Sequence, residues 1–195
     1  MARPRSNSAE IVLERATKLF WRNGFAATSM ADLVGETGSS KHSIYADFAS
    51  KHGLYRACFD WYREKIVAPA LEPFRAMEPK LNAISQYFEI QISLAEETGL
   101  PGPGCLVGNA MTETAPKDAQ IAELVRDHNL RLEAAFGKAL PADLGSDETA
   151  RITSFLVLAA QGLWAMSRVT TSSTALREQA SLTVELIERE LNYGK

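Results

Sequence analysis

The chain has 195 residues with 21 basic and 24 acidic side chains, which give a formal net charge of −3. A hydrophobic content of 46% and a charged content of 23% are typical of folded domains and argue against wholesale disorder. Two cysteines, Cys58 and Cys105, are too few for a disulfide framework, and no stretch is apolar enough to span a membrane, so we expect a cytoplasmic protein without a membrane partner.

The first 50 residues predict three helices, because apolar residues recur there at helical spacing and strand signals are nearly absent. A first helix is expected over residues 8–23, and Gly24 should end it. Thr28 is the expected N-cap of a short second helix that ends at Gly38. The third helix should begin after Ser39 or Ser40 and carry Ile44, Tyr45 and Phe48 on its apolar side.

Helical periodicity continues to the C-terminus, interrupted by segments rich in proline and glycine. Ser50 should cap a long fourth helix over residues 51–77, which Pro69 and Pro73 would kink or end early. The run of glycine and proline at residues 99–104 predicts a loop. Further helices are expected over residues 79–98, 105–114, 116–140, 147–170 and 174–193. The expected fold class is therefore all-α, with a three-helix head followed by a larger helical body.

Charge is distributed unevenly between these two parts. Residues 1–65 carry ten basic and seven acidic side chains, whereas residues 66–195 carry 11 basic and 17 acidic ones. The net charge of the whole chain argues against nucleic acid as a partner, but a basic head on an acidic body suggests two separate tasks. A charge difference of this size could also arise by chance. The sequence motifs therefore decide whether the head binds nucleic acid. We expect two domains, at residues 1–50 and 51–195.

The turn at residues 36–39, between the second and third helices, has the sequence form of a helix-turn-helix. Gly38 allows a sharp turn, and the second helix of such a pair can lie in the major groove of DNA. Residues 16–55 resemble the DNA-binding domain of TetR-family transcriptional repressors, with the family spacing intact. The matching positions are Ala16, Leu19, Phe20, Gly24, Phe25, Thr28, Ser29, Asp32, Leu33, Gly38, Ser40, Lys41, Ile44, Tyr45, Phe48, Lys51, Leu54 and Tyr55.

The resemblance implies that this head binds double-stranded operator DNA. It places base readout on the first turn of the third helix and phosphate contacts at the N-termini of the second and fourth helices. The expected DNA-binding residues are Thr28, Ser29, Ser40, Lys41, His42, Ser43, Tyr45 and Lys51. Arg3 and Arg5 are either an arm that reaches the DNA or a solvated tail.

The body shows no HExxH, CxxC or GxSxG motif, and His128 is the only histidine in its acidic part, residues 66–195. We therefore expect no enzyme, no cofactor and no metal site. The resemblance implies instead a pocket for an unidentified small-molecule effector. Each candidate could also be an ordinary core residue, and Cys105 is either an oxidant-sensing thiol of lowered pKa or an inert buried one. The ligand-binding candidates are Trp61, Tyr62, Tyr87, Phe88, Cys105, Asn109, His128, Trp164 and Arg168.

The resemblance also implies a homodimer that forms through the last two helices. Apolar residues in both helices recur at spacings of three and four, and a palindromic operator requires a two-fold axis. The expected dimerisation residues are Phe155, Ala159, Leu163, Leu176, Val184 and Ile187.

Together these features predict a ligand-responsive homodimeric repressor, which a small molecule releases from a palindromic operator. An activator role stays open. The alternative is a small-molecule-binding or enzymatic helical protein without specific DNA binding.

Overall fold

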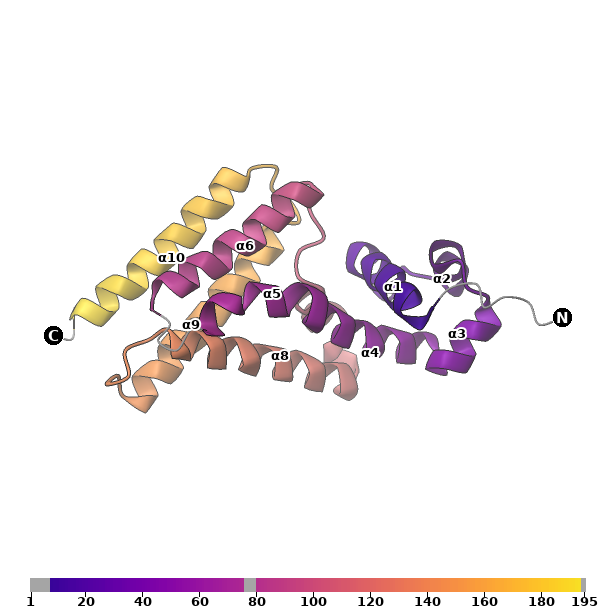
Figure 1. The fold of residues 1–195 in the computed structure, drawn as a ribbon, viewed down its shortest axis with the longest axis horizontal. Helices are drawn as coiled ribbons and strands as arrows, with labels where there is room; N and C mark the ends of the chain where they lie inside the picture. Colours follow the sequence, from indigo (N-terminus) through magenta and orange to yellow (C-terminus); the bar gives the residue numbers. More distant parts are fainter. Residues whose placement is uncertain (1–7, 76–79, 194–195) are drawn as a thin grey trace.

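The computed structural model describes residues 8–75 and 80–193, and all of their regular secondary structure is helical. Figure 1 shows an elongated molecule with α1, α2 and α3 at one end and α10 at the other. The segment that starts with α4 connects the two ends. The expected all-α class is confirmed. Arg3 and Arg5 lie outside the described residues.

The head contains α1 (Ala9–Asn23), α2 (Met30–Thr37) and α3 (Lys41–Phe48), and local signals set most of their ends. The Ser8 hydroxyl accepts a hydrogen bond from the backbone of the first turn of α1. Gly38 ends α2 in the left-handed conformation, with φ of 67°, which a residue without a Cβ adopts at little cost. Ser40 caps α3, so the expected three-helix order is confirmed.

The expected N-cap of α2 was wrong by one residue. Ser29 is the N-cap, because its hydroxyl accepts a hydrogen bond from the Asp32 N–H while the Asp32 carboxylate accepts one from the Ser29 N–H. This reciprocal pair is a capping box. Thr28 lies one residue earlier and is fully buried, and its hydroxyl donates instead to the Gly24 carbonyl at 2.7 Å.

The fourth expected helix is broken into several segments: α4 (Lys51–Tyr62), a π-helical turn η1 (Arg63–Val67), α5 (Ala68–Ala70) and a 3₁₀ turn η2 (Glu72–Arg75). Pro69 has no N–H, so the carbonyl four residues before it loses its usual donor. The chain widens there, and the Ala68 N–H donates to the carbonyl of Arg63, five residues back. The prolines therefore interrupt the helix as expected.

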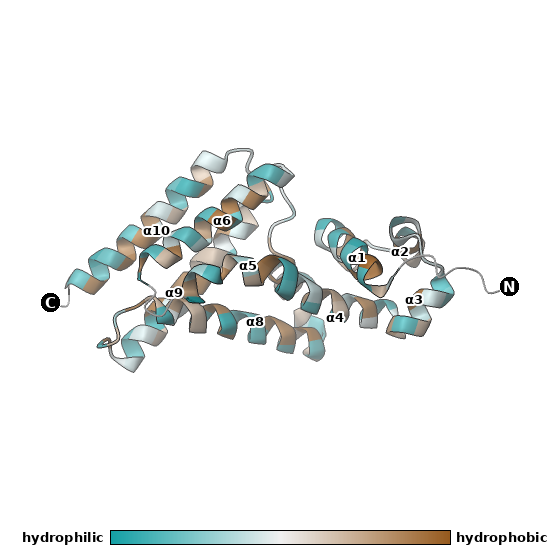
Figure 2. Ribbon diagram, viewed as in Figure 1, coloured by the Kyte–Doolittle hydropathy of each residue, from teal (hydrophilic) through white to brown (hydrophobic). Residues whose placement is uncertain are grey.

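The body contains α6 (Asn82–Thr98), α7 (Leu106–Glu113), η3 (Ala115–Lys117), α8 (Ala119–Lys138), α9 (Ser146–Met166) and α10 (Ser173–Tyr193). Helix α10 packs along α6 and also against α9, and α8 packs on both α7 and α9 (Figure 1). Pro116 opens the short turn η3 rather than the next helix, which Asp118 caps. Hydrophobic and hydrophilic residues alternate along these helices, as amphipathic packing requires (Figure 2).

The head is fastened to α4 by an aromatic cluster. The rings of Phe20 and Tyr55 meet edge to face with centroids 4.9 Å apart, and Phe25 lies 4.8 Å from Tyr55. Both Phe20 and Tyr55 are buried, as are Leu33 on α2 and Ile44 on α3. The N-terminal half of α4 thus completes the core of the head. Throughout residues 8–75 and 80–193, none of the helices has the length and apolar character needed to cross a bilayer.

Candidate functional site

The first turn of α3 faces outward. The Ser40 hydroxyl accepts a hydrogen bond from the Ser43 N–H at 3.1 Å, which fixes the start of the helix. Lys41 and His42 follow directly and are exposed, whereas Ile44 on the opposite face is buried against the head. A polar, basic helix start thus projects from the surface on a rigid support.

Two further candidates pair cations with aromatic rings. Tyr45 is 39% exposed, and the Lys41 ammonium lies 5.7 Å from the centre of its ring. The Lys51 ammonium lies 4.3 Å from the centre of the Phe25 ring, and partial burial lowers the pKa of Lys51. A contact between Lys51 and phosphate would therefore start from a side chain already held in place by the ring of Phe25.

Thr28 and Ser29 do not share the role expected for them. The buried Thr28 hydroxyl cannot meet a phosphate at the surface, and it already donates to Gly24. Ser29 is exposed at the N-terminus of α2, where backbone N–H groups favour an anion, although the Asp32 carboxylate takes one of those positions. Ser29 therefore stays a candidate phosphate contact, and the side chain of Thr28 does not.

A small cavity lies inside the body, where α4, α6, α8 and α9 meet the start of α7. Its free volume is about 10 Å³, room for about one water molecule. Five of the nine expected ligand-binding residues line it: Tyr62, Tyr87, Cys105, His128 and Trp164. Val67, Gln91, Gly104, Leu132 and Gln161 complete its wall.

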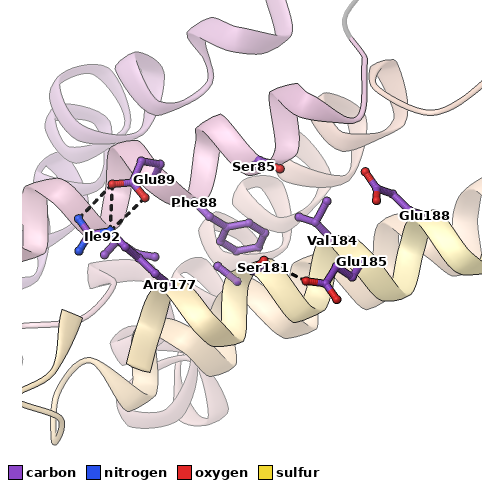
Figure 3. Close-up of a pocket in the computed structure, with 10 residues that line it drawn as sticks. Ser85, Phe88, Glu89, Ile92, Arg177, Ser181, Val184, Glu185 and Glu188 are labelled. Atoms are coloured by element: carbon purple, nitrogen blue, oxygen red, sulfur yellow. Dashed lines mark hydrogen bonds and ion pairs between the residues drawn. The ribbon is translucent and has the colours of Figure 1, made fainter. Parts of the chain in front are cut away.

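The other four expected ligand-binding residues lie away from this cavity. Asn109 and Arg168 bind each other, since an Arg168 guanidinium N–H donates to the Asn109 side-chain oxygen at 2.7 Å. Trp61 is half-buried and is not part of the cavity wall. Phe88 instead lines a surface groove between α6 and α10 (Figure 3).

That groove has a volume of about 370 Å³ and is far more open than the interior cavity. Figure 3 shows Arg177 on α10 held by Glu89 on α6, with a closest distance of 3.0 Å. Arg177 also pairs with Glu96 at 2.8 Å. These ion pairs engage the charged side chains at this end of the groove. The groove is therefore part of the packing interface between α6 and α10.

Sequence reasoning missed Gln161. Its side-chain oxygen is buried and has no hydrogen-bond partner among the described residues. Its side-chain N–H donates to the side-chain oxygen of Asn129 at 3.3 Å. A signal was available, because Gln161 is a polar residue within the apolar run of residues 155–164. It falls on the same face of α9 as the buried residues Val157, Ala160 and Trp164.

Of the two accounts of Cys105, the structure agrees with the inert buried thiol and not with an oxidant-sensing thiol of lowered pKa. Cys105 is buried, and burial raises the pKa of its thiol despite its position at the start of α7. The hydrogen bonds from the Tyr62 hydroxyl and the Gly108 N–H oppose this shift without reversing it. The thiol is therefore protonated at neutral pH, which agrees with the inert alternative. Cys58 is buried as well, and its pKa is raised to about 12.

His128 is neutral for a similar reason. Burial lowers the pKa of His128 to about 4, although the nearby Asp127 opposes the shift. Within the residues that the structure describes, no group of three or more His, Cys, Asp or Glu side chains is arranged to hold a metal ion. The histidine thus contributes an uncharged imidazole to the cavity wall.

The burial of His128 should make folding pH-dependent. An unfolded chain takes up a proton on this histidine below about pH 6.5, whereas the folded chain resists it down to about pH 4. Stability from this group is therefore complete above pH 6.5 and is lost as the pH falls toward 4. We expect the free energy of unfolding to drop by about 2 kcal/mol from pH 7 to pH 5 on this account.

Urea unfolding at the two pH values checks the pH prediction. The difference in unfolding free energy between pH 7 and pH 5 should be about 2 kcal/mol smaller in His128→Leu than in the wild type. It should keep the wild-type value in the control His42→Leu, because His42 is exposed. An equal pH dependence in wild type and His128→Leu would contradict it.

Helix α7 connects the cavity to the head. The indole N–H of Trp21 on α1 donates to the carbonyl of Gly104, which lines the cavity, at 2.8 Å. At the other end of α7, the Glu113 carboxylate accepts the backbone N–H groups of Phe25 and Ala26 at 3.0 and 2.8 Å. The Trp21 ring also packs edge to face on Tyr62, with centroids 5.0 Å apart. The cavity wall and the head therefore share direct contacts.

The expected dimerisation residues divide into two groups. Leu163, Leu176, Val184 and Ile187 are buried within the protomer, so they stabilise its own core and are not free to meet a partner. Amphipathic spacing alone did not distinguish the inner face of each helix from the outer one. Phe155 is exposed and Ala159 is half-buried. The large apolar side chains that the structure describes as exposed on α9 and α10 are Phe155, Leu158, Met166, Leu182 and Leu186.

Comparison with known proteins agrees with this architecture. Residues 12–58 match the family model of the bacterial regulatory proteins of the tetR family. The chain is 28% identical to the HTH-type transcriptional repressor ComR of Escherichia coli over 191 residues, which cover 94% of this chain and 90% of that protein. It is 22% identical to an uncharacterised HTH-type transcriptional regulator, YezE of Bacillus subtilis, over 96% of this chain and all of that protein.

Solved structures show the same fold. A TetR transcriptional regulator from Legionella pneumophila superposes with a TM-score of 0.79 at 18% identity, covering 94% of this chain and 99% of that one. A cysteine mutant of the TetR-family regulator CifR, complexed with 26-base-pair operator DNA, gives a TM-score of 0.76 at 19% identity, covering 94% and 98%. With its capped helix-turn-helix and all-helical body, the chain is similar to TetR-type transcriptional regulators over nearly its whole length, and residues 12–58 match the family model of the tetR regulatory proteins.

Proposed function

We propose that the chain is a homodimeric transcriptional repressor whose two heads bind the half-sites of a pseudo-palindromic operator. A small molecule that enters the interior cavity releases it from the DNA. The proposal divides the chain into a DNA-binding head of residues 1–50 and an effector-binding and dimerising body of residues 51–195. The observation that carries it is the exposed first turn of α3, with Lys41 and His42 projecting from a buried support.

DNA binding is supported by the chemistry of the head. An isolated helix with an accessible N-terminal turn fits the major groove, where a lysine can donate to guanine or phosphate oxygens. Two heads in a dimer would place their recognition helices about 34–36 Å apart, one turn of DNA. The acidic excess lies in the body, which would be repelled by phosphate and so limits contact to the heads.

Dimerisation is supported by the outer faces of α9 and α10. Phe155, Leu158 and Met166 form an exposed apolar stripe along α9, and Leu182 and Leu186 form another on α10. Leu158 is 70% exposed in the protomer, which is unusual for a leucine at the centre of a long helix. We assign the dimer interface to these residues, together with the half-buried Ala159, in place of the four that the protomer buries.

Release by an effector is supported by the path from the cavity to the head. Tyr62 belongs to α4, whose first residues follow α3 directly, so movement of Tyr62 moves the segment that carries the head. The effector must bind the DNA-free arrangement more tightly than the DNA-bound one, since only that difference can shift the equilibrium. The same contacts would serve an activator equally, and the sign of the regulation is read from transcription of the adjacent genes.

Replacing Lys41 tests the DNA-binding surface. Lys41→Ala should weaken binding to the operator by about 1–3 kcal/mol if the ammonium reads a base, and binding to unrelated DNA much less. An equal loss on both DNA sequences would assign Lys41 to a phosphate. Fluorescence anisotropy with labelled DNA from upstream of the gene, at fixed moderate salt, measures both.

The matched control is Lys117→Ala, because Lys117 is exposed on η3 of the body. It should bind operator as the wild type does. If the wild type shows no preference for any upstream sequence at moderate salt, the chain is instead a small-molecule-binding or enzymatic helical protein without specific DNA binding.

A further inference from the structure

The cavity wall offers a ligand no charge. The ten residues that line it include no Asp, Glu, Lys or Arg among those that the structure describes. Its ionisable members are Tyr62, Tyr87, Cys105 and His128. Burial raises the pKa of the first three and lowers that of His128, so all four are neutral at pH 7.

An ion would enter this cavity at a large cost. It would lose its hydration and find no opposite charge to replace it, and such unpaired buried charges are strongly destabilising. A neutral molecule avoids that cost. The rings of Tyr62, Tyr87 and Trp164 supply apolar faces against which a flat or aliphatic body can pack.

One polar position in the wall is unfilled. Several polar groups at the cavity already have partners: the Tyr62 hydroxyl donates to the Cys105 thiol, and the Tyr87 hydroxyl accepts from the Trp164 indole N–H. The side-chain oxygen of Gln161 has none, although the residue is only 9% exposed. A buried acceptor without a donor is costly, and a ligand that donates a hydrogen bond to it removes that cost.

Gln161 also lies against the helix that leads to the head. A Cβ placed on Gly108 of α7 would come within 2.5 Å of the Gln161 side-chain oxygen, so this glycine allows the amide to sit beside α7. The Gln161 amide therefore lies directly against the backbone of α7.

We propose that the effector is an uncharged molecule with an aromatic or apolar body and one hydrogen-bond donor, which it directs to the side-chain oxygen of Gln161. This rests on the proposed function, because it specifies the ligand of the same cavity. The free volume of about 10 Å³ and the adjoining space of about 30 Å³, which shares Gln91, Gly104 and Trp164, are smaller than any aromatic ring. Binding therefore moves the wall, and Gly104 is the part of the wall that holds Trp21 of the head.

Four small probes of similar size distinguish the relevant chemistry: phenol, toluene, benzoate and benzylamine. We expect isothermal titration of the full chain at pH 7 to show phenol binding about tenfold tighter than toluene, because one buried hydrogen bond separates them. Benzoate and benzylamine should bind at least about tenfold more weakly than phenol. Comparable binding of either ion, equal binding of phenol and toluene, or no binding of any probe would overturn the proposal.

A variant assigns the donor site. Gln161→Met removes the amide at similar length, and should abolish the preference for phenol while leaving the affinity for toluene within about twofold. The control Gln86→Met alters an exposed glutamine of α6 and should keep the preference. An unchanged preference in Gln161→Met would overturn the assignment, and the wild-type series stands even if this variant folds poorly.

Operator binding measured without probes is independent of these titrations. A protein that binds operator but none of the probes refutes only the ligand class. A protein that binds phenol but no operator refutes the repressor instead.

Discussion

Leu158→Asp should convert the proposed dimer to a monomer and weaken operator binding by about 100-fold or more. Leu158 lies on the outer face of α9, is 70% exposed in the protomer, and has apolar neighbours at Phe155 and Met166 on the same helix. An aspartate there would bury an unpaired charge in a two-fold interface, and symmetry would place two such charges close together. Two linked heads gain about 10²–10⁴ in affinity over one, and a monomer loses that gain.

Sedimentation velocity measures the mass, and anisotropy measures the affinity for the full operator and for a single half-site. The variant should lose affinity for the full operator while its weak binding to a half-site stays within about twofold of the wild type's. The control is Leu130→Asp, since Leu130 on α8 is 62% exposed and lies outside the proposed interface. A monomeric wild type, or a dimeric Leu158→Asp, would refute the proposed interface.

The head was the more predictable part of the fold, because its signals are local. Ser8, Gly24, Gly38 and Ser50 all end or begin helices where the sequence placed them, and Ser40 is one of the two residues expected to begin α3. Each acts through its own backbone conformation or through a hydrogen bond to a residue at most four positions away, so neighbouring residues suffice to read it. The one error, at Thr28, arose where two adjacent hydroxyl residues competed for one cap and the buried one lost.

The body was less predictable, because its interior depends on which helix faces which. The periodicity of α10 correctly placed Leu176, Val184 and Ile187 on one face. It did not show that α6 covers this face within the same protomer. The cavity likewise joins residues from α4, α6, α8 and α9 that are far apart in sequence. Five of its aromatic and polar residues could be guessed by type. Gln161 stands out in the sequence as a polar residue in an apolar run, but its unpartnered side-chain oxygen is visible only in the structure.

Glu113→Ala should loosen the contact between the head and α7, with a loss of about 2–3 kcal/mol in unfolding free energy. The Glu113 carboxylate accepts two backbone N–H groups, those of Phe25 and Ala26, across 88 and 87 positions of sequence. Hydrogen bonds to an ionised group stabilise more than neutral ones, about 1.5–3 kcal/mol for each buried bond. The Ala26 N–H is exposed and regains water when the carboxylate is lost, so most of the effect comes from the half-buried Phe25.

The position of Glu113 supports this role. It is the last residue of α7, where the helix dipole disfavours a negative charge. The two N–H groups of the head offset that penalty, so the carboxylate is held at the interface rather than in solvent. Glu113→Gln keeps one acceptor oxygen and should recover about half of the loss, which a purely packing role for this side chain would not give.

Hydrogen exchange shows which amides lose protection, whereas unfolding measurements give only the change in stability of the whole chain. In Glu113→Ala the amides of Phe25 and Ala26 should exchange about 30-fold to 150-fold faster, as a loss of about 2–3 kcal/mol implies, while those of α9 stay protected. The control Glu97→Ala, at an exposed position on α6, should leave both regions unchanged. Because Gly104 before α7 binds Trp21 and Glu113 at its end binds the turn after α1, the short helix holds the head at two points. Unchanged exchange at Phe25 and Ala26 would mean that the Glu113 hydrogen bonds do not help to hold the head, and that an effector acts on the DNA-binding surface through Gly104 and α4.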